Sequence, residues 1–401
     1  MRFTISLSMS NHYANSGYRR GRGTRRRRKK KTFRQSFWRF VKSGRFIVSL
    51  FALAAVFLFT ISAVTLVKRA LFHKPVEEEL IDAEDSESEE DLYSMEDVEI
   101  EVADPVDPEV ASFAPGNTFE RTKKTKKIPA FKEDGTGSTI VSGNAVLVDL
   151  DNGTIVCERD ADAVIPPASM TKIMTLLVAS EHLDQEDLED TYILRGDTLS
   201  YAYNNGCSVV GFLENEKVTI ADLMYGTILP SGADAVIGLC NVVAGGHDQF
   251  VELMNDKLEE LGLSDTAHFT NAVGIYDDNH HCTVLDIAVI LKNALYSETN
   301  REVLRARTYT TRKTKKHPSG ITISNLFLRR IEDKPLPGSA EGAKTGFVNQ
   351  SGNCAASYLV TPDNRHYICV TAHSTSAWRC IYDHVDIYNQ FVKPAKSNSE
   401  D

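Results

Sequence analysis

Paired cysteines and a local balance of charge are what this sequence lacks. Its seven cysteines stand singly, with no CxxC pair, so neither a zinc ribbon nor a dense disulfide framework is expected. Residues 1–45 contain fifteen Lys and Arg but no Asp or Glu, whereas residues 75–120 contain eighteen Asp and Glu but no Lys or Arg. The 401 residues suffice for one large domain or two small ones. Charge divided into such blocks argues against a single soluble cytosolic domain.

One stretch, residues 46–67 (FIVSLFALAAVFLFTISAVTLV), has no charged side chain. As a helix it would be about 33 Å long, enough to cross a hydrocarbon layer of roughly 30 Å. A buried core helix and a cleaved signal peptide are the alternatives, but a signal peptide has a shorter apolar region of about 7–15 residues. We expect an uncleaved transmembrane signal anchor.

The flanks of this stretch predict its orientation. Because positively charged flanks stay inside, residues 1–45 are expected to form a basic cytoplasmic tail, with the rest of the chain outside a bacterial cell membrane. The run RRRRKKK at residues 25–31 could also bind nucleic acid or anionic lipid. Orientation already accounts for it, so we expect a membrane contact and no nucleic acid partner.

Residues 68–138 have the composition of a linker. Their acidic part is poor in large apolar residues and repels itself, so an extended, disordered segment is expected. A short basic patch, RTKKTKK at residues 121–127, follows it. This patch is either a solvated tether or a contact to an anionic surface.

A folded domain is predicted over residues 139–393, with a short tail at 394–401. Two alternating segments joined by Asp151-Asn152-Gly153 predict a β-hairpin, because Asn-Gly favours tight turns. Apolar residues three and four apart predict helices in the middle of the chain, and alternation returns near its end. Expected strands cover 144–150, 154–158, 351–360 and 366–371, and expected helices begin at 169 and cover 219–229, 234–244, 247–261, 284–295 and 377–392. This order predicts an α+β domain whose one sheet is built from both chain ends.

Three short segments carry chemistry. In PPASMTK, residues 166–172, the two prolines put Ser169 in the first turn of a helix, where Lys172 shares its face. A lysine can act as a base there if burial or a neighbouring cation lowers its pKa. LPSGADA, residues 229–235, is a tight turn that could present Ser231 beside Lys172. Alone, the first segment is also compatible with a capping serine and a surface lysine, and the second with a helix cap that has Asp234 in the first turn.

The third segment is EGAKTGF, residues 341–347, which leads into a strand. Lys344 offers an ammonium group that could lower the pKa of Lys172 and attract a carboxylate. Thr345 offers a hydroxyl group, and Gly346 leaves room for a substrate strand alongside. The alternative is a glycine-flanked turn with an exposed lysine.

Together the three segments resemble the serine D-alanyl-D-alanine carboxypeptidases, the low-molecular-mass penicillin-binding proteins with their SxxK, SxN and KTG motifs. The resemblance runs from about residue 145 to 371, and the motif order and spacing match as well. It implies a β-lactamase/transpeptidase-like domain with an antiparallel sheet and a helical cluster. The implied activity is removal of the terminal D-alanine from peptidoglycan stem pentapeptides, with β-lactams as covalent inhibitors and no metal or cofactor.

The resemblance also implies a role for each matching residue. Ser169 matches the acylated nucleophile, Lys172 its general base and Ser231 the serine that relays a proton to the leaving amine. The substrate carboxylate would be held by Lys344 and Thr345. Backbone N–H groups of Ser169 and Phe347, next to Gly346, would form the oxyanion hole.

One residue departs from the family pattern. Ala233 stands where the second motif usually has an asparagine, which puts full turnover in doubt. The rival hypotheses are a degenerate, non-catalytic peptidoglycan-binding protein and a β-lactamase, although the sequence lacks a Glu-x-x-x-Asn loop for the latter. His280-His281 with Asp286 lacks metal-ligand spacing, so no metal site is expected. Cys207, in a loop near the expected cleft, is either a reactive thiol or a structural one.

Overall fold

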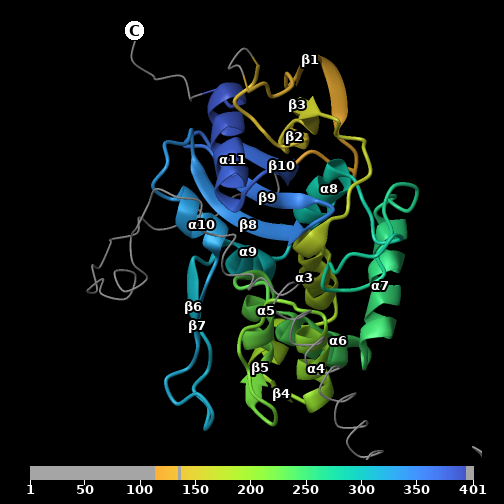
Figure 1. The fold of residues 1–401 in the computed structure, drawn as a ribbon, viewed down its shortest axis with the longest axis vertical. Helices are drawn as coiled ribbons and strands as arrows, with labels where there is room; N and C mark the ends of the chain where they lie inside the picture. Colours follow the sequence, from red (N-terminus) through yellow and green to blue (C-terminus); the bar gives the residue numbers. More distant parts are fainter. Residues whose placement is uncertain (1–112, 134–136, 394–401) are drawn as a thin grey trace, which may run out of the picture. The chain divides into compact units, whose positions relative to one another are not determined.

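A six-stranded sheet gathers segments from both ends of the folded chain (Figure 1). The computed structural model describes residues 113–133 and 137–393. The sheet order is β1-β3-β2-β10-β9-β8, and only the β1–β3 pair is parallel. The strands are β1 (Glu120–Lys127), β2 (Asn144–Asp149), β3 (Thr154–Arg159), β8 (Ser339–Val348), β9 (Gly352–Val360) and β10 (His366–Ser374). The predicted α+β class and the sheet built from both chain ends are confirmed.

The two faces of the sheet bury different sets of side chains because side chains alternate along a strand. On β10, Ile368 and Val370 join the large core beneath the helical cluster. Tyr367 and Cys369 point the other way and pack with residues of α11 (Ala377–Phe391), which covers that face (Figure 1). Both faces of the sheet are therefore buried. This accounts for the nearly continuous apolar sequence of the central strands, because side chains on either face are shielded from water.

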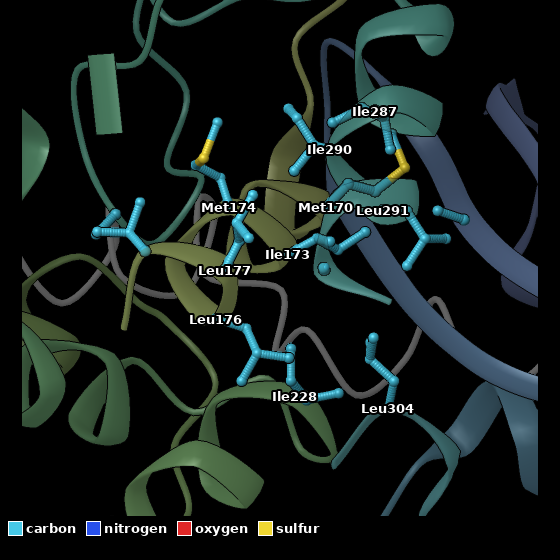
Figure 2. Packing of buried hydrophobic residues seen from close by; sticks show 14 of the residues in the cluster. Met170, Ile173, Met174, Leu176, Leu177, Ile228, Ile287, Ile290, Leu291 and Leu304 are labelled. Carbon is cyan, nitrogen blue, oxygen red and sulfur yellow. The ribbon is translucent and has the colours of Figure 1, made fainter. Parts of the chain in front are cut away.

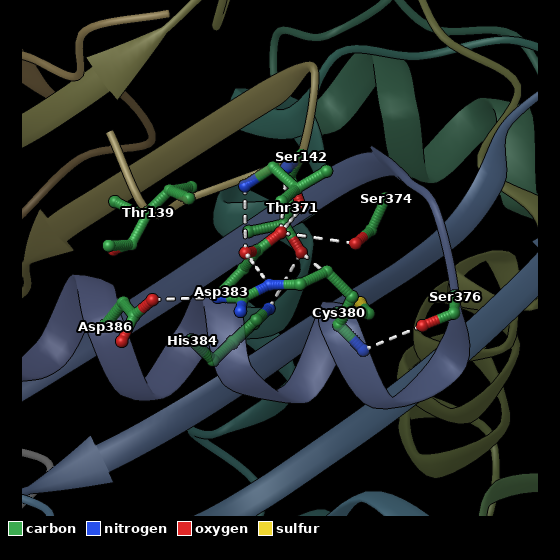
Figure 3. Close-up of polar contacts among 12 residues, drawn as sticks. Thr139, Ser142, Thr371, Ser374, Ser376, Cys380, Asp383, His384 and Asp386 are labelled. Atoms are coloured by element: carbon green, nitrogen blue, oxygen red, sulfur yellow. Dashed lines mark hydrogen bonds and ion pairs between the residues drawn. The ribbon is translucent and has the colours of Figure 1, made fainter. Parts of the chain in front are cut away.

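A buried carboxylate fixes α11 to the sheet (Figure 3). Asp383 accepts hydrogen bonds from the backbone N–H groups of Val141 and Ser142 at 2.9 and 2.8 Å. It also binds the Ser374 hydroxyl group and pairs with Arg379 one turn earlier in the helix. A fully buried charge needs such partners, so this cluster ties the start of β2 to the last helix.

The middle of the chain forms the helical cluster, in which α3 is central. On one side of α3, Met170 and Ile173 pack with Ile287 and Leu291 (Figure 2). On another side, Leu176 lies near Ile228. A helix surrounded in this way is apolar all round. The helical elements are η3 (Ala168–Thr171), α3 (Lys172–Glu181), η4 (Gln185–Glu189), α4 (Gly196–Asn204), α5 (Ile220–Ile228), α6 (Ala233–Ala244), α7 (His247–Glu260), α8 (Val284–Ala294), α9 (Glu298–Arg305) and α10 (Leu326–Ile331).

Local sequence signals explain where two of these helices begin. Thr219 before α5 and Thr283 before α8 each form a capping box with an aspartate three residues later, Asp222 and Asp286. Periodicity did not predict the shorter elements. These are α4, α9, α10 and two small antiparallel two-stranded sheets, β4 (Thr191–Ile193) with β5 (Lys217–Thr219) and β6 (Thr308–Thr310) with β7 (Thr322–Ser324).

The basic patch expected in the linker is instead a strand of the sheet. β1 pairs with β3, and its Arg121 and Lys127 side chains bind the buried Glu158. The expectation of a disordered linker as far as residue 138 is therefore wrong for Glu120–Lys127, because a buried carboxylate more than thirty residues away recruits these cations. The predicted tail at 1–45, span at 46–67, most of the linker and the tail at 394–401 lie outside the described residues. Within the described ranges, no helix is long and apolar enough to cross a membrane.

Candidate active site

The first motif forms the junction between a 3₁₀ turn and α3. Pro166 and Pro167 precede η3, which contains Ser169, and α3 begins at Lys172. Ser169 is half-buried, and the Lys172 Nζ lies 2.9 Å from its Oγ. The sequence prediction that these two side chains share one face is confirmed, with the first turn wound as 3₁₀ rather than α.

Lys172 is buried and hydrogen-bonded. Its side chain is 1% exposed, and its Nζ also donates to the carbonyl oxygen of Val273 at 2.7 Å. Burial lowers the pKa of Lys172 to about 7, although the charges of Cys207 and Asp234 oppose the shift. Near neutral pH a substantial fraction of this amine is therefore unprotonated and able to accept the Ser169 proton.

The second motif forms the turn between α5 and α6. Ser231 has φ +64°, a left-handed conformation that is rare for a residue with a side chain. A Cβ on Gly232 would lie 2.9 Å from the Val210 nitrogen, so only glycine fits there. The Lys344 Nζ donates to Ser231 Oγ at 2.9 Å. The second and third motifs thus meet through a hydrogen bond.

Lys344 is the second buried amine of the site. It is 1% exposed and also donates to the carbonyl oxygen of Thr345 at 2.7 Å. Burial, together with the charge of Lys172, lowers the pKa of Lys344 well below its usual range. The expectation that Lys344 lowers the pKa of Lys172 needs correction: burial accounts for that shift, and the charge effect acts on Lys344.

The third motif brings strand β8 against η3, the turn that contains Ser169 and is called the nucleophile turn below after the role expected for Ser169. A Cβ added to Gly346 would lie 2.8 Å from the Ser169 nitrogen, so glycine allows the close contact. Thr345 is half-buried, and the Phe347 side chain is 59% exposed. Strand β8 ends the sheet order, so within the described residues no strand covers its outer edge. All seven residues singled out from the sequence therefore lie on three adjoining elements.

Ala233 begins α6 and is fully buried. Its backbone N–H donates to the carbonyl oxygen of Ser208 at 2.8 Å. The neighbouring Asp234 carboxylate accepts from the N–H groups of Val210 and Gly211. The turn is therefore fixed by hydrogen bonds of the Ala233 N–H and the Asp234 carboxylate, and Lys172 has a hydrogen-bond partner in the Val273 carbonyl without an asparagine at position 233.

The loop containing Val273 is the part of the site that sequence reasoning missed. The Asn271 Oδ1 accepts from the N–H groups of Gly274 and Ile275 at 2.7 and 3.0 Å, which shapes the loop around Lys172. Gly274 has φ +89°, and a Cβ there would overlap the Ala168 carbonyl oxygen. The signal in the sequence was a glycine soon after an asparagine, which by itself indicates only a turn.

The described parts of the chain contain neither a cluster of potential metal ligands nor a disulfide. No group of three or more potential metal-ligating side chains is found there, and the His280 ring lies against two threonines, Thr171 and Thr270. All seven cysteines, which fall within the described ranges, are free. Burial raises the pKa of the Cys207 thiol, while the charge of Lys172 opposes this. Cys207 is thus near the site as expected, and its environment favours an unreactive, protonated thiol.

Comparison with known proteins gives a consistent result. The family described as D-alanyl-D-alanine carboxypeptidase matches residues 130–374. The chain is 29% identical to the D-alanyl-D-alanine carboxypeptidase DacF of Bacillus subtilis over 227 residues, 56% of each chain. It is 33% identical to DacD of Escherichia coli over 163 residues, 40% of this chain and 42% of the relative. The matches thus span about half the length of these curated relatives.

The match to one solved structure of similar fold includes nearly all of that structure's chain. A mutant of the Streptomyces K15 DD-transpeptidase superposes with a TM-score of 0.58 and 26% identity. The match covers 62% of this chain and 97% of that one.

Proposed function

The chain belongs to the D-alanyl-D-alanine carboxypeptidase family, and on that premise we propose that it is a serine D,D-carboxypeptidase acting on peptidoglycan stem peptides. It would remove the terminal D-alanine of the pentapeptide through an acyl-enzyme on Ser169. The observation that carries this proposal is the pair formed by Ser169 Oγ and Lys172 Nζ, 2.9 Å apart, with a lysine pKa of about 7.

Acylation follows from that pair. The unprotonated Lys172 amine takes the Ser169 hydroxyl proton while Oγ attacks the carbonyl carbon of the penultimate D-alanine. The oxyanion would be stabilised by the N–H groups of Ser169 and Phe347, worth roughly a hundredfold or more in rate for each donor. The substrate strand would lie along the open edge of β8, with its terminal carboxylate near Lys344 and Thr345.

Departure of D-alanine requires a proton on its nitrogen as the C–N bond breaks. Ser231 Oγ can supply it and be reprotonated by Lys344, to which it is already hydrogen-bonded. Lys172 then passes the proton that it took from Ser169 to Lys344, which had given up its own through Ser231. The free Lys172 amine takes a proton from the water that attacks the ester, and it returns that proton to Ser169 Oγ as the ester C–O bond breaks. β-Lactams would acylate the same oxygen, but their ring-opened product would not leave the site.

The same proposal includes the cellular location. The uncharged stretch at 46–67, with its basic flank, supports a single-pass membrane anchor that leaves the domain outside a bacterial cell. Removing residues 46–67 from the expressed chain should move it from the membrane to the soluble fraction. Full retention in the membrane after this deletion would contradict the proposal.

A second candidate is transfer of the acyl group to an amine instead of water. The similarity to the Streptomyces K15 DD-transpeptidase favours it, because that match covers nearly all of the relative. Both reactions share the acyl-enzyme and differ only in the nucleophile that attacks it. The ratio of transfer to hydrolysis at increasing glycine or D-alanine concentration separates the two.

The decisive experiment is D-alanine release from an N-acyl-L-Lys-D-Ala-D-Ala peptide by the full-length chain in detergent, compared with Ser169→Ala. We expect release by the wild type, none by the variant, and a penicillin adduct on Ser169 only in the wild type. A wild type that binds the peptide without releasing D-alanine would support a non-catalytic binding protein. Rapid turnover of penicillin would instead support a β-lactamase.

A further inference from the structure

Behind the nucleophile turn lies a buried imidazole that the mechanism above does not use. His280 is 2% exposed, and its Nδ1 accepts a hydrogen bond from the Thr270 N–H at 3.0 Å. Because a backbone N–H can only donate, the ring proton must sit on Nε2. That nitrogen lies 2.9 Å from the Thr171 hydroxyl oxygen. Burial lowers the pKa of His280 to about 3, so the ring stays neutral at working pH.

The hydrogen bonds continue in one direction. Since His280 Nε2–H donates to Thr171 Oγ1, the Thr171 hydroxyl proton is free to donate elsewhere, and it points to the carbonyl oxygen of Ala168 at 2.8 Å. Thr171 is fully buried, so water does not compete for these contacts. A chain of fixed polarity therefore runs from the Thr270 N–H through His280 and Thr171 to Ala168.

This chain ends on the peptide unit that bears the nucleophile's amide. Ala168 has φ +48°, a strained conformation for a residue with a side chain. In a trans peptide the C=O and the N–H point in opposite directions. Holding the Ala168 carbonyl against Thr171 thus aims the Ser169 N–H away from Thr171. Gly274 and Gly346 lie so close to this peptide that neither position has room for a Cβ.

We propose that His280, acting through Thr171, is a positioning residue that orients the Ser169 amide as an oxyanion donor. The inference rests on the proposed acyl transfer at Ser169. In this proposal His280 does not bind a metal and does not transfer a proton to the substrate. It acts on the orientation of the Ser169 amide, and the roles of Ser169 Oγ and Lys172 are unchanged.

The first test compares two changes at Thr171 in the full-length chain. Thr171→Val keeps the shape but removes the hydroxyl group, and it should lower both penicillin acylation and kcat for D-alanine release about 10- to 100-fold with little change in KM. Thr171→Ser keeps the hydroxyl group and should stay within about threefold of wild type. Thr227→Val is the matched control, because it also removes one buried hydroxyl-to-carbonyl bond, here to Leu223, away from the nucleophile turn.

The second test separates the two nitrogens of His280. His280→Gln can still place an N–H against Thr171 and should retain most activity. His280→Asn can accept from Thr270 but is too short to reach Thr171, and it should lose activity as Thr171→Val does. If Thr171→Val does not fold, this pair of variants still decides the question.

Two readouts distinguish positioning from a general loss of structure. The acid limb of the pH–rate profile, set by Lys172, should keep its midpoint in Thr171→Val while the plateau falls. If the plateau rate of Thr171→Val and His280→Asn equals that of the wild type, the inference about His280 is wrong, whereas the proposed function is unaffected. The inference is also wrong if Thr227→Val loses as much activity as Thr171→Val, or if the midpoint of the acid limb is displaced in Thr171→Val. A wild type that forms no adduct and releases no D-alanine would overturn the proposed function, and the inference with it.

Discussion

Lys172 and Lys344 are both buried to 1% exposure and are close enough for the charge of Lys172 to lower the pKa of Lys344. Each is hydrogen-bonded to a different serine, Lys172 to Ser169 and Lys344 to Ser231. Two ammonium groups repel each other in a site without water. Once one lysine has lost its proton, the pKa of the other rises, so the second lysine keeps its charge more easily. This coupling suits a reaction in which one amine must accept a proton while its neighbour donates one.

The pH dependence of acylation should report Lys172. Only the unprotonated amine can accept the Ser169 proton, and the pKa is about 7. The rate of penicillin acylation should therefore rise about tenfold per pH unit below pH 7 and level off above it. Stopped-flow acylation between pH 5 and 9 measures this. A rate that is flat from pH 5 to 7 would exclude Lys172 as the base.

Replacing this lysine should stabilise the protein while abolishing activity. The folded-state pKa lies below the usual value of 10.5, so the folded state binds the proton more weakly than the unfolded state does. The resulting cost to stability is full below about pH 7 and vanishes as the pH rises toward 10.5. Lys172→Met should thus be about 1–3 kcal/mol more stable than wild type at pH 6, with the gap closing by pH 10. Thermal unfolding at both pH values tests the sign.

Two glycines on β8 should respond differently to alanine. In Gly346→Ala the new Cβ would lie 2.8 Å from the Ser169 nitrogen, forcing the strand and the nucleophile turn apart. Acylation should fall about a hundredfold or more. In Gly342→Ala on the same strand the nearest atom to the new Cβ is the Leu304 Cβ at 3.3 Å, so this variant should acylate at a rate close to wild type. Equal rates for the two variants would show that the contact with Ser169 does not matter.

Ser231 combines the proposed role in proton transfer with a strained backbone, and two substitutions separate them. Both Ser231→Ala and Ser231→Gly remove the hydroxyl group that binds Lys344, so both should slow D-alanine release about 10- to 1,000-fold. Only glycine adopts φ +64° without strain, so Ser231→Gly should be about 1 kcal/mol more stable than Ser231→Ala. Denaturant titration of both variants checks this difference. Identical stabilities would argue against strain at this position.

Asp383 should matter for stability and not for chemistry. Asp383→Asn places an NH₂ group among donors, the Val141 and Ser142 N–H groups and the Arg379 guanidinium, so at least one contact is lost inside the protein. The free energy of unfolding should fall by about 2–4 kcal/mol. The kcat of the folded variant at 20 °C should stay within about twofold of wild type. A large loss of kcat without loss of stability would assign Asp383 a role in the site.

Local sequence patterns predicted the hairpin, the helix that begins near Ser169, four central helices, the last two strands and the last helix. The signals for these elements lie within a few residues of one another. The Asn-Gly turn at Asn152 and the Thr-x-x-Asp boxes at Thr219 and Thr283 are signals of the same short range. Strand β1 was misjudged because nothing near it indicates a strand. Its basic side chains are recruited by Glu158, which only the folded sheet brings into reach.

The sequence by itself identified the candidate site residues: Ser169 with Lys172, Ser231, and Lys344 within its KTG segment. Tertiary structure decided what these residues can do. The Val273 carbonyl, 101 positions from Lys172, and His280, 109 positions from Thr171, reach the nucleophile turn only through folding. The lowered pKa of Lys172 likewise arises from burial, which no local pattern encodes. Reactivity here depends on the exclusion of water, and that is a property of the packed chain as a whole.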